Sequence, residues 1–488
     1  MRTLWLFADG EWRASASTDT IVVDDPATGE RVGECPRGCA EDVEAAVRSA
    51  RGAAAGWARV APAERAALVR RAAARLREHA DELAQLVTRE MGKPLADARG
   101  GVEAGAGTLE QYAELGPLHG GRTLQGGWDA TDLMIREPRG VVGVITPWND
   151  PVAIACGLIG AALVTGNTVV HKPSERTPHA GARLVELLAE DLPPGVLTMV
   201  AGDRSAGAPL AAHPDLDLLA HVGSTRAGRE IAATARCRVL RENGGKDPMI
   251  VDEGVDPKWA AAQAALGAFA NAGQICVSVE RIYVHRSVAE PFTAALVIAA
   301  QALRTGSGLD EATTLGPLVD RRQRDIVHEH VRSAVEAGAR LLTGGEIPDG
   351  PGAFYPATVL ADCTDDMPVM REETFGPVAA VRVVGSFDEA LALANTGEYG
   401  LAATVLTPSL AHVQRAWREL RAGTVKVNAV FGGAPGGAAQ PLGASGEGFG
   451  YGPELLDEMT HTKVVHIAAL EDPATFERPA VPGNGALP

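Results

Sequence analysis

The stretch that decides the fold reads VVGVITPWNDPVAIACGLIGAALVTGNTVVHK and covers residues 141–172. A β-branched run opens it, an apolar segment of helical length follows, and after a turn at Gly166-Asn167 a second β-branched run closes it. Short β-branched runs are typical of strands buried on both faces, and a Gly-Asn pair marks a turn. The stretch predicts strand, helix and strand, the repeating unit of a parallel sheet covered by helices.

A transmembrane helix is the alternative interpretation of the middle of this stretch. Residues 151–170 carry no charged side chain, and about 20 such residues are enough to span a bilayer. The turn at residues 166–168 and the β-branched pair Val169-Val170 interrupt a continuous helix. We therefore expect a buried helix followed by a buried strand, and no membrane segment.

The same alternation continues along the chain. Further β-branched runs stand at residues 196–200 and 218–222, separated by helical segments. A second alternating region covers residues 250–427, with candidate strands at residues 282–284, 379–384 and 424–427. The fold class predicted is α/β. Because ligands on parallel sheets bind at the carboxyl ends of strands, the loops after the strands are where chemistry is expected.

The two ends of the chain lack this alternation. Residues 1–36 contain short strands with turns, and residues 40–115 are rich in Ala, Arg and Glu at helical spacing, with a Gly/Pro interruption at residues 91–94. Residues 471–488 are rich in Pro, Gly and Ala, which is typical of a loose tail. We expect a helical layer ahead of the sheet and no packed element at the C-terminal end.

Length and composition exclude several classes of protein. The 488 residues give room for about three domains or two large ones, and 46% hydrophobic with 22% charged residues is typical of a soluble globular protein. The formal net charge of −17 disfavours nucleic acid and anionic membranes as partners. Six cysteines are too sparse for a disulfide framework, and the apolar start ends at Asp9, too early for a signal peptide, so we expect a cytoplasmic protein.

Three polar loops follow the predicted strands of the first region. The loop after residue 145 contains Asn149, whose amide can donate to a developing oxyanion. The next contains Lys172 and Glu175, which suit the phosphate and ribose hydroxyls of a nucleotide. The third, Gly223-Ser224 with Gly228, can approach a pyrophosphate at a helix N-terminus. Taken singly, each is equally a turn or a helix cap, and neither a full dinucleotide fingerprint nor a P-loop occurs.

Two further loops supply a thiol and a carboxylate. Cys276 lies in an uncharged run, where a cysteine is usually an unreactive residue of the core. Glu242 precedes a Gly-Gly turn, where a single glutamate usually has a structural role. Covalent catalysis by a thiol needs a nucleophile, a base for the second half-reaction and an oxyanion donor. Cys276, Glu242 and Asn149 together supply all three.

Read together, these motifs strongly resemble the aldehyde dehydrogenase superfamily, over nearly the whole chain from Asp9-Gly10-Glu11-Trp12 to about Val465. The matching motifs, in family order and with family-like gaps, are Pro147-Trp148-Asn149, Lys172-Pro173-Ser174-Glu175, Gly223-Ser224-Thr225 with Gly228, Glu242 with Gly244-Gly245-Lys246, Gly273-Gln274-Ile275-Cys276, Glu372-Glu373-Thr374-Phe375-Gly376-Pro377 and Ala422-Gly423-Thr424-Val425-Lys426-Val427-Asn428.

The resemblance implies an activity and catalytic roles. The reaction would be the NAD(P)-dependent oxidation of an aldehyde to a carboxylic acid through a thiohemiacetal and a thioester. Cys276 would be the nucleophile, Asn149 the oxyanion donor and Glu242 the base that activates the deacylating water. Members that pass the acyl group to coenzyme A often lack this Glu, so its presence favours hydrolysis.

The resemblance also implies how a nicotinamide cofactor is held. Lys172 and Glu175 would bind the adenosine ribose, Ser224 the pyrophosphate, and Glu373 with Phe375 the nicotinamide ribose and ring. Because Glu175 would repel the extra phosphate of NADP, we expect NAD to be preferred by about tenfold. The full set of expected cofactor residues is Thr146, Pro147, Trp148, Lys172, Ser174, Glu175, Gly223, Ser224, Gly228, Gly244, Glu373 and Phe375. No metal is expected.

Three structural units are implied as well. Residues 1–119 and 138–243 would form a Rossmann-like NAD-binding domain, and residues 244–435 an α/β catalytic domain. Residues 120–137 and 451–470 would form a small β-arm that joins subunits into a homodimer or homotetramer.

The substrate side departs from the commoner family pattern. Asp150 stands where an aromatic residue usually follows the Trp-Asn pair, Gly157 adds little side chain, and Ile275 and Val277 flank the thiol. We expect a wide, polar entrance that disfavours acidic aldehydes, unless Asp150 is merely the cap of the helix that follows it. The loop at residues 441–448 is shorter than is typical. Further departures stand at residues 221–222, where His-Val replaces the usual Phe-Thr.

Two other functions fit the same residues. A Cys-dependent acyl hydrolase or acyltransferase would use the thiol without nicotinamide, and a non-catalytic scaffold would keep the fold without the chemistry. NADH formation with an aldehyde separates the first from a dehydrogenase, and failure to bind NAD would favour the second.

Overall fold

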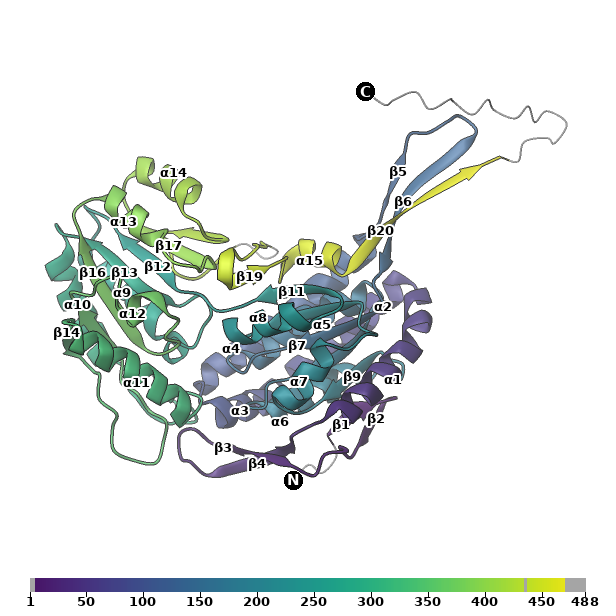
Figure 1. Ribbon diagram of the computed structural model, residues 1–488, viewed down its shortest axis with the longest axis horizontal. Coiled ribbons are helices and arrows are strands. Elements are labelled where there is room, and N and C mark those ends of the chain that lie inside the picture. The colour runs from purple at the N-terminus through teal and green to yellow at the C-terminus, as the bar shows by residue number, and fades with distance from the viewer. Residues whose placement is uncertain (1–4, 434–436, 470–488) are drawn as a thin grey trace.

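The computed structural model of the chain describes residues 5–433 and 437–469. Within these ranges the strands form two large sheets flanked by helices, a hairpin, and a smaller sheet that projects from the body (Figure 1). The mixed α/β class predicted from the alternating pattern is confirmed. The predicted tail at residues 471–488 lies outside the described residues.

The first sheet runs in the order β19-β11-β10-β7-β8-β9-β1-β2. Its central strands are parallel, and they are β7 (Val141–Ile145), β8 (Thr168–Lys172), β9 (Leu197–Val200), β10 (Leu218–Val222) and β11 (Arg238–Glu242). Antiparallel strands complete both edges: β1 (Leu6–Ala8), β2 (Glu11–Arg13) and β19 (Gly446–Glu447). The connecting helices are α5 (Pro151–Val164), α6 (Pro178–Ala189), α7 (Arg204–Ala211) and α8 (Thr225–Thr234). The strands predicted at residues 196–200 and 218–222 are confirmed as β9 and β10.

The predicted helical layer consists of α1 (Ala40–Arg59), α2 (Pro62–Glu78), α3 (Ala80–Met91) and α4 (Leu95–Leu115), followed by the 3-10 turn η1 (Gly116–Leu118). The predicted break falls after α3, because Gly92 takes a left-handed conformation with φ of 87° and Pro94 then stands at the N-cap of α4. The hairpin of β3 (Thr20–Asp24) and β4 (Arg31–Pro36) precedes this layer.

The second sheet runs in the order β14-β15-β16-β13-β12-β17-β18 and is parallel except for β14 against β15. Its strands are β12 (Asp247–Val251), β13 (Val279–His285), β14 (Arg340–Thr343), β15 (Thr358–Ala361), β16 (Val378–Val384), β17 (Ala402–Leu406) and β18 (Thr424–Val427). Its helices are α9 (Pro257–Phe269), α10 (Ala289–Gln301), α11 (Arg321–Glu336), α12 (Pro368–Arg371), α13 (Phe387–Ala394) and α14 (Leu410–Glu419), with the turns η2 (Ala270–Gly273) and η3 (Gly443–Ser445). The strands predicted in this region all lie within observed ones.

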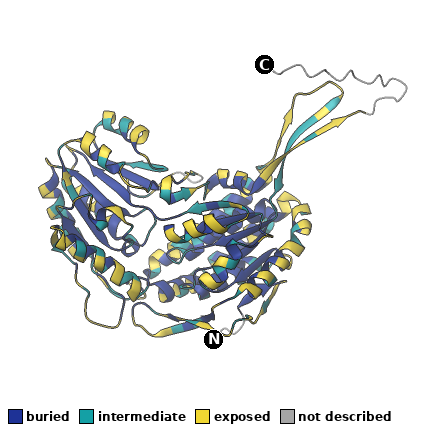
Figure 2. Cartoon of the chain, in the orientation of Figure 1, coloured by how far each residue is buried: buried dark blue, intermediate teal, exposed yellow. Residues whose placement is uncertain are grey.

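Helix α5 and strand β8 account for the uncharged segment of the sequence. The helix has 14 residues, most of them buried, and every residue of β8 is buried. The central strands of both sheets are buried in the same way (Figure 2). In the described part of the chain, no helix has the length and apolar character needed to cross a membrane. The expectation of a buried helix and strand is confirmed.

The projecting sheet is built from β5 (Arg122–Leu124), β6 (Ala130–Pro138) and β20 (Thr460–Ala468), with β20 paired antiparallel along the whole of β6. Residues 451–459 do not belong to it. Helix α15 (Gly452–Glu458) packs back on the body, where Leu455 and Leu456 join the core of the first sheet. The segment after Tyr451 therefore enters the projecting sheet only at Thr460.

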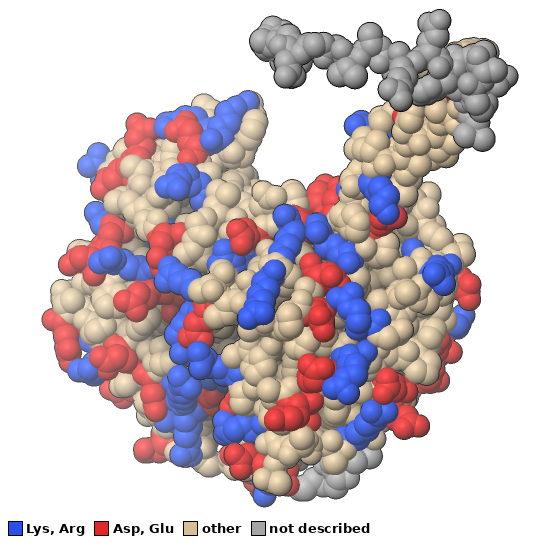
Figure 3. All heavy atoms as spheres, turned by 45° about the vertical axis from the view of Figure 1, so that its right-hand side comes forward, with Lys and Arg blue, Asp and Glu red and all other residues tan. Residues whose placement is uncertain are grey.

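Charged side chains of both signs are interspersed on the face shown in Figure 3. Among the described residues, several charged side chains make local ion pairs, such as Arg332 with Glu329 on α11 and Arg415 with Glu419 on α14. On this face, acidic side chains are therefore distributed among basic ones and are not concentrated in one patch.

Candidate active site

Cys276 follows a turn in an unusual backbone conformation. After α9, Asn271, Ala272 and Gly273 all have positive φ angles, of 49°, 54° and 71°. A Cβ on Gly273 would lie 2.0 Å from the carbonyl oxygen of Gly376, so the position requires glycine. Positive φ in ordinary residues costs free energy and is concentrated at functional sites.

Buried amides hold the peptide that leads to Cys276. The Oε1 atom of Gln274 accepts from Val319 N at 2.9 Å, and its Nε2 donates to the carbonyl of Asn271 at 3.1 Å. The carbonyl of Gln274 accepts from Asn149 Nδ2 at 3.1 Å and from Asn271 Nδ2 at 3.2 Å. Asn149 is therefore tied to the thiol loop through one N–H of its amide, which has a second N–H to donate.

Glu242 ends β11 and faces the thiol. Cys276 Sγ donates to Glu242 Oε1 at 3.5 Å. Burial raises the pKa of Glu242 above its usual value, and it raises the pKa of Cys276 well above its own, with the charge of Glu242 adding to the second effect. In this arrangement the thiol keeps its proton and directs it at a carboxylate that can accept it. The predicted Cys276, Glu242 and Asn149 are thus brought together.

The expected adenosine and pyrophosphate residues stand at the carboxyl ends of β8 and β10, the two strands on either side of β7 in the first sheet. Lys172 at the end of β8 is buried, and its Nζ donates to the carbonyls of Pro173 at 2.7 Å and Gly202 at 2.9 Å. Ser174 Oγ donates to the half-buried Glu175 at 3.4 Å. Ser224 caps α8, where its Oγ accepts from Ala227 N at 3.3 Å.

Two positions near this edge have a packing role. A Cβ on Gly228 would lie 1.9 Å from Asn243 Oδ1, so the missing side chain at Gly228 makes room for Asn243. A Cβ on Gly223 would lie 2.9 Å from His221 Nε2, so the imidazole lies against Gly223. His221 is buried, which lowers its pKa to about 4, and its Nδ1 has no hydrogen-bond partner among the described residues.

The expected nicotinamide residues, Glu373 and Phe375, lie on the loop between α12 and β16, where they contact loops that follow β11 and β7 of the first sheet. Glu373 Oε1 accepts from Gly245 N at 3.1 Å, and a Cβ on Gly244 would lie 2.1 Å from Glu373 Oε2. Burial, followed by the charge of Glu280, raises the pKa of Glu373. The ring of Phe375 meets that of Trp148 edge to face, with 5.5 Å between ring centroids. Thr146 and Pro147 precede this tryptophan on the loop after β7.

Two residues that the sequence motifs did not single out hold the Glu373–Phe375 loop. The carboxylate of Glu280 accepts from Thr374 N at 2.8 Å and Phe375 N at 2.9 Å, and it pairs with Lys246 Nζ at 2.6 Å. Gln323 Nε2 donates to the carbonyls of Thr374 at 3.2 Å and Phe375 at 3.1 Å. The signal for Glu280 is the charged pair Glu280-Arg281 within the strand sequence VERIYVH, because a buried charge needs partners.

Asp150 is neither a free carboxylate nor a side-chain cap. It occupies the N-cap position of α5, but with the described residues its side chain makes no capping hydrogen bond. Its Oδ2 instead pairs with Lys93 Nζ at 3.3 Å, and Lys93 is nearly buried. The charge expected to repel acidic aldehydes is therefore balanced by a neighbouring cation.

Gly157 does not leave an open space. A Cβ on Gly157 would lie 3.7 Å from two ring carbons of Tyr451, so an aromatic ring from the C-terminal segment covers it. The space expected at Gly157 is thus bounded by a residue almost 300 positions later in the chain. Ile275 and Val277, beside the thiol, are both half-buried.

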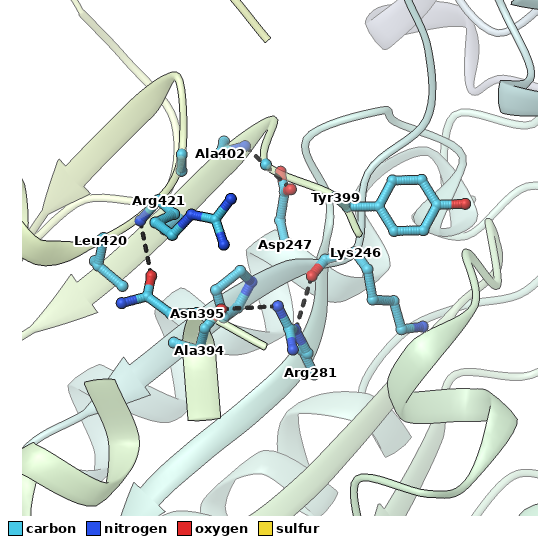
Figure 4. Close-up of a pocket in the computed structure, with 13 residues that line it drawn as sticks. Lys246, Asp247, Arg281, Ala394, Asn395, Tyr399, Ala402, Leu420 and Arg421 are labelled. Atoms are coloured by element: carbon cyan, nitrogen blue, oxygen red, sulfur yellow. Dashed lines mark hydrogen bonds between the residues drawn. The ribbon is translucent and has the colours of Figure 1, made fainter. Parts of the chain in front are cut away.

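A small cavity lies near the N-terminal ends of β12, β13 and β17, lined among others by Asp247, Arg281 and Ala402 (Figure 4). Asp247 Oδ1 accepts from Ala402 N at 3.1 Å, while Arg281 donates to the carbonyls of Lys246 at 2.8 Å and Ala394 at 2.9 Å. The cavity has a volume of about 10 Å³, which is room for one water and not for an aldehyde. The cavity is therefore too small to be the substrate site.

The aldehyde dehydrogenase family model matches residues 12–465 of this sequence. The chain belongs to the aldehyde dehydrogenase family. All six of its cysteines lie in the described ranges as free thiols, so Cys276 is not held in a disulfide in this member of the family.

Solved structures of the family are similar over almost the whole chain. An NAD-dependent aldehyde dehydrogenase from Sinorhizobium meliloti is 37% identical with a TM-score of 0.93, covering 97% of this chain and 96% of that one. A lactaldehyde dehydrogenase from Escherichia coli is 33% identical with a TM-score of 0.92, covering 95% and 99%. A betaine aldehyde dehydrogenase from Staphylococcus aureus, in complex with NAD+, is 32% identical with a TM-score of 0.92, covering 95% and 94%.

Proposed function

We propose that this aldehyde dehydrogenase uses NAD to oxidise an aldehyde to the carboxylic acid, which is released by hydrolysis of a Cys276 thioester. The observation that carries the proposal is the 3.5 Å contact between Cys276 Sγ and Glu242 Oε1, next to an asparagine amide tied to the same loop. This set supplies a nucleophile, a base and an oxyanion donor.

The residues at the carboxyl edge of the first sheet fit NAD. Lys172 and Glu175 follow β8, and Ser224 opens α8, where helix amides favour a pyrophosphate. The buried Nδ1 of His221 at the same edge has no partner among the described residues, so a ligand group is the natural partner for that atom. NAD, when bound, supplies the hydride acceptor. The carboxylate of Glu175 favours NAD over NADP by charge repulsion.

The first half-reaction uses the contact between thiol and carboxylate. Glu242 accepts the Cys276 proton, and the thiolate adds to the aldehyde carbon, so that a C–S bond forms and the carbonyl oxygen becomes an oxyanion. The second N–H of the Asn149 amide and the backbone N–H of Cys276 donate to that oxyanion. Departure of hydride from the same carbon leaves a thioester on Cys276.

The second half-reaction needs a base again. Burial raises the pKa of Glu242, which brings this carboxylate closer to the working pH and makes it a better proton acceptor. After Glu242 has released the thiol proton to solvent, it takes a proton from water, and the hydroxide adds to the thioester carbonyl. The C–S bond then breaks to give the carboxylic acid and the Cys276 thiolate, which takes the proton back from Glu242. A Cβ on Gly450 would lie 2.9 Å from Glu242 Oε2, so glycine there leaves space beside the base.

The experiment is NADH formation, measured by absorbance, with a panel of aldehydes and NAD. We expect turnover by the wild type and by Cys237→Ala, which removes another half-buried free thiol, and none by Cys276→Ala. Hydrolysis of an activated ester without any NADH formation would point to an acyl hydrolase. Failure to bind NAD would point to a scaffold.

We also infer that the projecting sheet joins two copies of the chain. Trp128 in the β5–β6 turn is fully exposed, and Val464 and Ile467 on β20 are more than half exposed. Exposed apolar side chains on a projecting element are typical of an interface. Light scattering should give a dimer or tetramer, and a monomer would contradict this assignment. The free thiols support a reducing compartment such as the cytoplasm.

A further inference from the structure

We propose that Tyr451 selects the substrate: its ring forms the wall over Gly157, and its hydroxyl oxygen accepts a hydrogen bond from a hydroxyl group on the distal part of the aldehyde. The inference rests on the proposed function, since it assigns the distal end of the same site. The substrate class is therefore hydroxyaldehydes, preferred over alkyl aldehydes of equal size.

The position of the ring is set by three structural elements. Tyr451 stands at the N-cap of α15, and two of its ring carbons lie 3.7 Å from where a Cβ on Gly157 of α5 would be. On its other side it meets Tyr112 of α4, edge to face, with 6.3 Å between ring centroids. A larger residue at position 157 would collide with the ring. Gly157 and Tyr451 thus form a complementary pair, and Tyr451 as a residue remains 39% exposed.

The hydrogen bonds of the tyrosine decide which role its hydroxyl can play. Tyr451 Oη lies 2.6 Å from Thr108 Oγ1, and Thr108 Oγ1 donates to the carbonyl of Ala104 at 2.8 Å. A threonine hydroxyl has one proton, which the Ala104 carbonyl takes. Tyr451 must therefore be the donor to Thr108, and its oxygen has only acceptor capacity left. A substrate hydroxyl satisfies that acceptor, whereas an alkyl chain leaves it without a partner.

The tyrosine also lies near the chemistry. The residue before it, Gly450, lies against the Glu242 carboxylate, with a Cβ position 2.9 Å from Oε2. Tyr451 is thus one residue from the base on one side and covers α5, the helix that follows Asn149, on the other. The Asp150 carboxylate is balanced by Lys93, and the tyrosine oxygen offers a substrate a neutral acceptor.

The test compares matched aldehydes. The ratio of kcat/KM is measured for 3-hydroxypropanal against butanal and for 6-hydroxyhexanal against heptanal, pairs with equal numbers of heavy atoms. We expect wild type to prefer at least one hydroxyaldehyde, and Tyr451→Phe, which keeps the ring, to lower that ratio by about three- to tenfold. A wild type without such a preference, or a Tyr451→Phe variant with an unchanged ratio, overturns the assignment of the hydroxyl.

The wall is tested separately with a bulky aldehyde, 3-phenylpropanal. Tyr451→Ala should raise its kcat/KM relative to butanal by about tenfold, and Gly157→Phe in the Tyr451→Ala background should reverse the gain. An unchanged preference in Tyr451→Ala overturns the assignment of the wall. Trp417→Ala, which removes an exposed ring on α14, is the matched control and should change none of these ratios.

Thr108→Val gives a third, independent measurement. Without Thr108 the tyrosine proton is free, so a substrate with only an acceptor can now bind it. We expect the ratio of kcat/KM for 3-methoxypropanal to that for pentanal to be higher in Thr108→Val than in wild type. An equal ratio in the two proteins contradicts the acceptor role. If the wild type forms no NADH with any aldehyde, the proposed function fails, and not only the role of Tyr451. Thermal unfolding shows whether a variant with low activity is misfolded or is folded with a changed site.

Discussion

The cofactor side and the substrate side of Cys276 are built differently. On the cofactor side, Lys172 and Ser224 stand directly after the strands that position them, so short motifs place them. On the substrate side, the wall over α5 comes from Tyr451, whose hydroxyl bonds to Thr108, 343 residues earlier in the chain. On the proposed assignments, short local motifs place the residues of the shared chemistry, whereas the wall proposed to select the aldehyde is formed by packing between segments distant in the sequence.

The largest expected effect is on the covalent step at Cys276, which lies between the cofactor side and the substrate side. Cys276→Ala removes the nucleophile, and we expect kcat for NADH formation to fall at least about ten-thousandfold. Binding of NAD, measured by calorimetry, should stay within about twofold because the expected cofactor residues are untouched. If Cys276→Ala still formed NADH at a measurable fraction of the wild-type rate, Cys276 would not be the nucleophile that reacts between the cofactor side and the substrate side.

The second prediction sharpens the cofactor side. Glu280→Gln leaves the buried Lys246 without its carboxylate and loosens the loop that carries Phe375. We expect a loss of about 3 kcal/mol or more in the free energy of unfolding, together with a higher KM for NAD. Arg332→Gln, which breaks exposed pairs with Glu329 and Glu336, is the control and should cost less than about 1 kcal/mol. Equal costs would mean that burial does not distinguish the Glu280 pair from the exposed pairs.

The third prediction concerns cofactor choice. Wild type should use NAD with a kcat/KM about tenfold or more above that for NADP, because Glu175 stands where the extra phosphate would be repelled. Glu175→Gln should reduce the preference to about threefold or less. Comparable kcat/KM values with both cofactors in wild type would show that the local motif does not fix this choice.

The smallest expected effect concerns Asp150, the residue that the sequence suggested as a selector against acidic aldehydes. Because Asp150 is paired with Lys93, Asp150→Asn should change the ranking of succinic semialdehyde against butanal by less than about threefold. The double variant Lys93→Met, Asp150→Asn should likewise keep the wild-type ranking. A strong gain for the acidic aldehyde in Asp150→Asn alone would restore Asp150 as the selector.

The limits of prediction from sequence follow the same division. The strands, the helical layer and the loops that bring together Cys276, Glu242 and Asn149 could be predicted, because hydrophobic pattern and strand ends are local properties. The partner of Asp150 could not be predicted, since Lys93 lies on another element. The contact of Tyr451 with Gly157 could not be predicted either, because the sequence around each residue gives no sign of the other.

The central claim, a covalent step at Cys276 followed by hydrolysis through Glu242, is tested most directly by rapid mixing of Glu242→Gln with aldehyde and NAD. The account predicts about one NADH per active site and then a stall, with the acyl group found on Cys276 by mass spectrometry. The burst itself should be slower than in wild type, because Glu242 also receives the thiol proton across the 3.5 Å contact. Steady turnover of Glu242→Gln at the wild-type rate would contradict it.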